Sequence, residues 1–173
     1  PGSSAGIYRR ALEARGIPVA AGTGGSVLDT GEAEVLLALL RVLDNPLQDI
    51  PLAAVLASPV FRFTADHLGR MRAAHREGSL FEALTGAAEA GDRQAPACLA
   101  LLDSLRQTAR LETLTRLLEK IYAQTHMEAV FAAMEGGERR RKNLEFLYET
   151  AAAFEQGGRR DLSQFLAHLD SLA

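Results

Sequence analysis

The chain has 173 residues, and 47% of them are hydrophobic, which excludes a disordered tail and is enough for one substantial core or two small ones. The formal charge is −3, from 19 basic and 22 acidic residues, so no overall positive field attracts a nucleic acid. The single cysteine excludes an internal disulfide, and the longest apolar stretch, Val35 to Leu40, is far below the ~20 residues that span a bilayer. We therefore expect a folded, cytoplasmic protein without a membrane partner.

The N-terminal residues predict a short helix followed by one strand. Apolar residues recur at helical spacing over residues 7–12, and Gly16 stands where a glycine typically ends a helix. Residues 17–20 form a brief apolar run that suits a strand of a parallel sheet. No later segment predicts a partner for this strand, so we interpret residues 1–30 as a remnant of an α/β domain whose sheet lies elsewhere.

Residues 31–173 predict helices only, and we assign them to one all-α domain. The pair Asp29 and Glu32 indicates a capping box before an apolar helix that ends at Asn45-Pro46. Apolar residues cover almost the whole circumference of this helix, which predicts deep burial. A short helix is expected to begin at Pro51 and to end before Ser58, and Thr64 is expected to cap a polar helix that runs to Gly78.

The middle of the chain predicts one further capping box and two helical stripes. Ser79 and Glu82 form the box, and residues 86–96 are small and polar, as in a loop. A first stripe comprises Cys98, Leu101, Leu102 and Leu105. A second stripe, residues 111–122, continues it as a separate helix or after a bend, with a break at Thr125-His126.

Two more helices are predicted after Gly136-Gly137. The first has an apolar stripe and ends at Gly157-Gly158; the stripe is Leu144, Leu147, Tyr148, Ala151 and Phe154. Asp161 and Gln164 cap the second, which still runs at the last residue. Because helices normally finish with a glycine or a polar cap, we expect the chain to be a piece of a longer protein.

We find no catalytic residue and no metal site in the sequence. The loop at residues 22–26 follows a predicted strand, but it lacks the lysine of a P-loop and the third glycine of a dinucleotide site, so a plain turn is favoured. The histidines lie on separate elements, and none belongs to an HExxH pair. Cys98 is interpreted as a small core hydrophobe rather than a nucleophile.

Arg139, Arg140, Arg141 and Lys142 are our candidate nucleic-acid-binding residues. They stand at a helix start, where cations oppose the helix dipole, so a function other than helix stability is indicated. Arginine side chains and free backbone N–H groups at a helix start suit a phosphate. A solvated, ion-paired face is slightly favoured over a phosphate contact, because Glu138 and Glu145 are spaced for pairs with Lys142 and Arg141. A second, weaker group is Arg62, His67, Arg70, Arg72, His75 and Arg76.

Three segments resemble the AddA-type helicase component of the AddAB-type ATP-dependent helicase/nucleases, which are relatives of the UvrD/Rep and RecB helicases. They are residues 7–19, with Gly16-Ile17-Pro18-Val19; residues 34–59, with Leu43-Asp44-Asn45-Pro46-Leu47; and residues 117–147, with Gly136-Gly137-Glu138-Arg139-Arg140-Arg141. The resemblance implies that residues 1–30 belong to motor domain 2A and that residues 31–173 are the helical insertion called 2B. Residues 61–64 depart from the GIG-type turn of UvrD/Rep relatives, so the resemblance transfers no specific duplex contact.

The resemblance implies an accessory domain of a DNA motor that acts in double-strand break repair and recombination. It implies ATP and Mg²⁺ in the parent protein, with no cofactor in this chain, and its implied partners are DNA and an AddB-like subunit. The Walker lysine, the Walker B acids, the motif VI arginine and nuclease carboxylates are absent, so we expect no catalysis from this chain alone. The alternative is a helical protein-interaction module without DNA binding, which fits the negative net charge.

Overall fold

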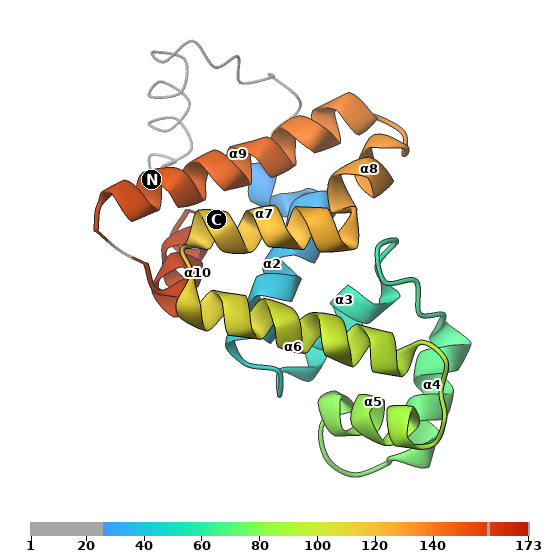
Figure 1. Ribbon diagram of the computed structural model, residues 1–173. Coiled ribbons are helices and arrows are strands. Elements are labelled where there is room, and N and C mark those ends of the chain that lie inside the picture. The colour runs from blue at the N-terminus through green and yellow to red at the C-terminus, as the bar shows by residue number, and fades with distance from the viewer. Residues whose placement is uncertain (1–25, 159, 173) are drawn as a thin grey trace.

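The computed structural model describes residues 26–158 and 160–172. Within these ranges the chain forms nine α-helices and one short 3-10 helix and no strand, which confirms the all-α class (Figure 1). The elements are η1 (Val27–Asp29), α2 (Gly31–Asp44), α3 (Asp49–Ala57), α4 (Ala65–Ala74), α5 (Leu80–Glu89), α6 (Ala95–Leu111), α7 (Leu114–Thr125), α8 (Met127–Ala132), α9 (Gly137–Gln156) and α10 (Leu162–Asp170).

Helix α2 is the centre of the fold. It contacts α3, α6, α9 and α10, and Figure 1 shows it lying between α9 and α6. Nine of its 14 residues are buried, as the apolar residues around its circumference predict. Buried side chains from the other helices join those of α2 in one continuous cluster, so the described residues share a single hydrophobic core.

Most predicted helix starts are confirmed, because short side chains cap them locally. Thr64 accepts a hydrogen bond from the backbone N–H of His67, and Asp161 accepts one from that of Gln164. Ser79 and Glu82 form the complete capping box. Asn45 ends α2, as predicted.

Three predicted boundaries differ from the structure. Helix α3 begins at Asp49, so Pro51 is its third residue; a proline fits there because the first N–H groups of a helix have no internal acceptor. Helix α4 ends at Ala74 rather than Gly78, whose positive φ of 81° turns the chain toward α5. The last helix ends at Asp170, so the prediction that it still runs at the end of the chain is wrong.

The predicted loop at residues 86–96 is mostly helical. Helix α5 continues to Glu89 because alanines favour a helix, and α6 begins at Ala95. Asp92 starts α6, since its Oδ1 accepts hydrogen bonds of 2.8 Å from the backbone N–H groups of both Gln94 and Ala95. Only residues 90–94 connect the two helices.

The second stripe belongs to a separate helix rather than to a bent one. Thr113 caps α7, and Leu111, which the stripe placed in the core, is 82% exposed at the end of α6. The predicted break at Thr125-His126 is confirmed: His126 has a left-handed backbone with φ of 52° and links α7 to α8.

The predicted N-terminal helix, strand and glycine loop lie outside the described residues. The structure describes residues 26–30 of the predicted 2A remnant, and here η1 packs on α2 and places Leu28 in the core. The boundary between residues 30 and 31 therefore stays a prediction. No helix in the described ranges is both long enough and apolar enough to cross a membrane.

Candidate nucleic-acid interface

The predicted basic cluster begins at a tight turn between α8 and α9. Gly136 has a left-handed backbone with φ of 70°, and Gly137 is buried against the end of α8. A Cβ atom on Gly137 would lie 1.9 Å from the carbonyl oxygen of Ala132, which no side chain tolerates. These two glycines therefore allow α9 to start directly against α8 and determine where its first turns point.

Arg140 points into the protein rather than toward solvent. Its Nη1 donates to Oε2 of Glu32 at 2.6 Å, and its Nε donates to the carbonyl oxygen of Glu135 at 3.0 Å. Asn143 Nδ2 donates to the other carboxylate oxygen of Glu32 at 2.6 Å. Glu32 is only 1% exposed, so this cluster is an internal link between the starts of α2 and α9.

The Glu32 carboxylate is held in its charged form by its neighbours. Burial alone raises the pKa of Glu32, but hydrogen bonds from Asn143, its own backbone, Thr30 and Arg140 lower that pKa below the ordinary value of 4.5. The predicted capping box of Asp29 and Glu32 is therefore wrong. Asp29 instead accepts from the backbone N–H of Ser26 and caps η1, which leaves Glu32 free to bind α9.

Arg139, Arg141 and Lys142 are the exposed cations of this cluster. Lys142 forms the predicted pair with Glu138, at 3.2 Å between exposed side chains. Arg141 lies beside Glu145 in a shallow pocket of about 210 Å³, but the predicted ion pair between them does not form within the described residues. Because successive helical residues are about 100° apart, the cluster divides between an inward Arg140 and three outward cations.

In the second basic group, His67 and Arg72 are engaged in contacts within the protein. His67 Nε2 lies 2.6 Å from Asp92 Oδ2, and its ring stacks on Phe63 with centroids 4.8 Å apart. Arg72 donates to the carbonyl oxygen of Gly78 at 2.8 Å, which fixes the end of α4. Arg62 has an exposed side chain and a left-handed backbone with φ of 62°. Several members of this group therefore hold local structure.

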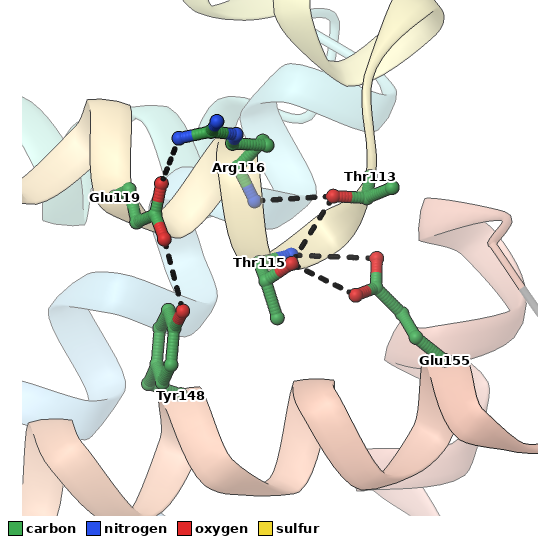
Figure 2. Close-up of polar contacts among 6 residues, drawn as sticks. All are labelled: Thr113, Thr115, Arg116, Glu119, Tyr148 and Glu155. Carbon is green, nitrogen blue, oxygen red and sulfur yellow. Dashed lines mark hydrogen bonds and ion pairs between the residues drawn. The ribbon is translucent and has the colours of Figure 1, made fainter.

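Sequence reasoning missed the polar contacts between α7 and α9, which Figure 2 shows. Glu155 of α9 accepts hydrogen bonds from the backbone N–H of Leu114 and from Thr115, whose Oγ1 lies 2.9 Å from Oε2. Glu119 of α7 accepts from Tyr148 of α9 at 3.0 Å and pairs with Arg116 at 2.8 Å. Glu155 is 40 residues from Thr115, so no local pattern could have indicated this cap.

The described residues contain one free cysteine and no cluster that could hold a metal ion. Burial raises the pKa of the Cys98 thiol to about 12, so it stays protonated at neutral pH and behaves as a core residue, as predicted. No three histidine, cysteine or acidic side chains within the described ranges are placed to hold a metal ion.

The known proteins to which the chain is similar share one name. The chain is 39% identical over 170 residues to the AddA subunit of the ATP-dependent helicase/nuclease of Acetivibrio thermocellus, and 40% identical over 182 residues to that of Heliobacterium modesticaldum. It is 34% identical over 174 residues to the protein of the same name from Carboxydothermus hydrogenoformans. These alignments cover 96%, 97% and 99% of the chain.

No family model matches the chain. It spans only 14%, 13% and 15% of the lengths of these three relatives, so it corresponds to one segment of each. Identity at this level over almost the whole chain is the mark of common descent. The chain therefore belongs, as a homologue of one segment, to the AddA family of ATP-dependent helicase/nuclease subunits.

Proposed function

We propose that the chain is a helical accessory domain of an ATP-dependent DNA helicase/nuclease acting in double-strand break repair, and that the start of α9 contacts the DNA backbone. Two observations support this proposal: the family relationship and the three exposed cations at the start of one helix. In this proposal DNA is bound through the parent protein, which also binds ATP and Mg²⁺ elsewhere and assembles with an AddB-like subunit. The isolated chain neither hydrolyses ATP nor cuts DNA.

The proposed contact uses Arg139, Arg141 and Lys142 and leaves out Arg140. The Arg140 side chain is 24% exposed and its guanidinium is bound to Glu32, so turning toward a phosphate would leave a buried carboxylate without its cation. The other three side chains reach solvent and break at most one exposed ion pair on binding. We therefore expect a weak, salt-dependent contact.

The experiment compares two triple variants of equal charge. The first changes Arg139, Arg141 and Lys142 to glutamine. The second changes the control residues Arg93, Arg110 and Arg160 to glutamine; they are also exposed, they lie outside both basic groups, and no ion pair holds them within the described part of the chain. Binding to a forked duplex is measured by fluorescence anisotropy between about 50 and 200 mM salt.

If the start of α9 contacts DNA, the first variant loses affinity and the slope of log affinity against log salt falls by up to about 2.7, while the control variant changes little. Equal affinities for both variants and the wild type would remove the basic cluster from the proposal. An equal loss in both would indicate a general charge effect.

A protein-interaction module is the second candidate function. The net charge of −3 favours it, and so do the glutamates that surround the exposed cations. Stable association at high salt with a second subunit, combined with no binding to the forked duplex, would select this function.

A further inference from the structure

A pocket of about 750 Å³ lies where four helix ends meet. Its walls come from the end of α2, the end of α6, the start of α7 and the residues that precede α10. The end of α6 contributes the largest share of the lining, including the exposed Leu111. The candidate DNA contact uses none of these residues, whereas the core forms part of the pocket floor through Leu43 and Leu162.

Three arginines line the pocket, and none of them has a partner within the described residues. Arg106 and Arg110 come from α6, and Arg160 precedes α10. The Nε atom of Arg106 is buried and lacks a hydrogen-bond acceptor. Most buried donors in proteins are satisfied, and an orphaned one indicates a missing partner. Three unpaired guanidinium groups make a carboxylate or phosphate the complementary ligand.

The acidic residues of the pocket decide between these two anions. Asp44 also lines it without a partner in the described ranges, Glu112 lies close enough to Arg116 to interact with its charge, and Asp161 is occupied in capping α10. A nucleic-acid backbone carries phosphates at regular spacing and would meet these carboxylates. A protein segment can instead place an acidic residue on the arginines and a basic or neutral one near Asp44 and Glu112.

Leu111 supports a protein ligand for an independent reason. It is a large apolar side chain that is 82% exposed on the lining of a charged pocket, and such a residue offers nothing to a phosphate backbone. Protein interfaces combine an apolar contact with surrounding charges of complementary sign. Leu111 is therefore suited to pack against an apolar residue of a bound segment.

We propose that this pocket docks a segment of the same polypeptide from outside this chain, which carries an acidic residue for Arg106 and Arg110 and an apolar residue for Leu111. The proposal rests on the proposed function in one respect: the chain is a domain of a longer protein, as in relatives of which it spans 13% to 15%. A domain of this kind must contact the remainder of its polypeptide, and this pocket combines unpaired arginines, a buried donor without an acceptor and an exposed leucine.

Photo-crosslinking in the full-length protein tests this proposal. A benzoylphenylalanine replaces Leu111, and the matched control carries it at Ala100, another exposed position of α6. Mass spectrometry then maps the crosslinks. We expect position 111 to link to a segment of the same polypeptide that contains Asp or Glu beside an apolar residue. The variant R110E is expected to reduce this crosslink about tenfold, and R110K to retain it.

Crosslinks from position 111 to DNA or to another subunit would overturn the proposal, as would a yield no higher than at position 100. Circular dichroism of R110E checks that the exposed substitution leaves the fold intact. The forked-duplex measurement on the same variants separates the two proposals, because Arg110 lies outside the basic cluster. The crosslinking result can contradict the docking proposal while the α9 variant still loses DNA affinity. Equally, the docking proposal can hold while the α9 variant binds DNA unchanged.

Discussion

At the scale of single residues, Glu32 shows how one buried charge organises the candidate interface. Its two carboxylate oxygens accept from Arg140 and Asn143, so the first turns of α9 are fixed on the start of α2. A carboxylate with three or more hydrogen bonds is stable in the interior only while all its partners are present. The exposed cations of the cluster therefore project from a helix start that is bound to α2.

Glu32→Gln is expected to lower the free energy of unfolding at pH 7 by about 2 kcal/mol, because Arg140 loses its charged partner. Folding lowers the pKa of Glu32, so its contribution is complete above the unfolded value of 4.5 and is lost as the pH falls through the lowered value. Urea unfolding at several pH values should therefore show the difference between wild type and variant shrinking in acid. A constant difference would contradict this assignment, and exposed Glu138→Gln serves as the control.

Gly137→Ala tests the turn that positions the cluster. Its new Cβ would overlap the carbonyl oxygen of Ala132, so α8 and α9 must separate, at a cost of about 1–3 kcal/mol. Gly69→Ala is the matched control, since its Cβ meets nothing within 4 Å inside α4 and is expected to stabilise by about 0.5–1 kcal/mol. Thermal melts of both variants give the comparison, and equal shifts would contradict it.

At the scale of helices, α7 illustrates capping from a distance. Thr113 caps it from within its own sequence, whereas Glu155 caps it from α9 and adds a negative charge at the positive end of its dipole. The two helices are joined again by the contact between Tyr148 and Glu119, visible in Figure 2. The hydrogen bond to Glu119 is also the main reason that the pKa of Tyr148 lies above its ordinary value.

Glu155→Ala is expected to cost about 1–2 kcal/mol, because the N–H of Leu114 and the side chain of Thr115 lose their acceptor. Glu149→Ala, an exposed change on the same helix, is expected to stay within about 0.5 kcal/mol. Hydrogen exchange should locate the effect of Glu155→Ala in the first turn of α7. Equal losses in the two variants would show that Glu155 is merely a surface residue.

At the scale of the whole molecule, the single core around α2 predicts that the helices unfold together. Leu39→Ala removes a fully buried side chain at the centre and is expected to cost about 2–5 kcal/mol. Far-UV circular dichroism and hydrogen exchange should then report one common transition in urea. Two separate transitions would contradict a single cooperative core, and hydrogen exchange would show which helices unfold first.

Much of this fold could be predicted because several side chains form hydrogen bonds with backbone groups close to them in the sequence. Ser79 with Glu82, Thr64 and Asp161 bond to backbone groups within three residues, so the helix starts that they cap could be predicted from local sequence. The apolar circumference of α2 likewise predicted its burial. The position of Leu111 could not be predicted, because helical spacing does not show where one helix ends and the next begins.

The candidate site also has features that the sequence predicts and features that depend on the tertiary structure. The sequence by itself determined that Arg139, Arg140, Arg141 and Lys142 stand together at a helix start, because that depends on chain order alone. Only the tertiary structure decided that Arg140 binds Glu32 across 108 residues of chain while the other three face solvent. The physical reason is that a charge is placed by its partner in space, and a partner from a distant helix leaves no local trace in the sequence.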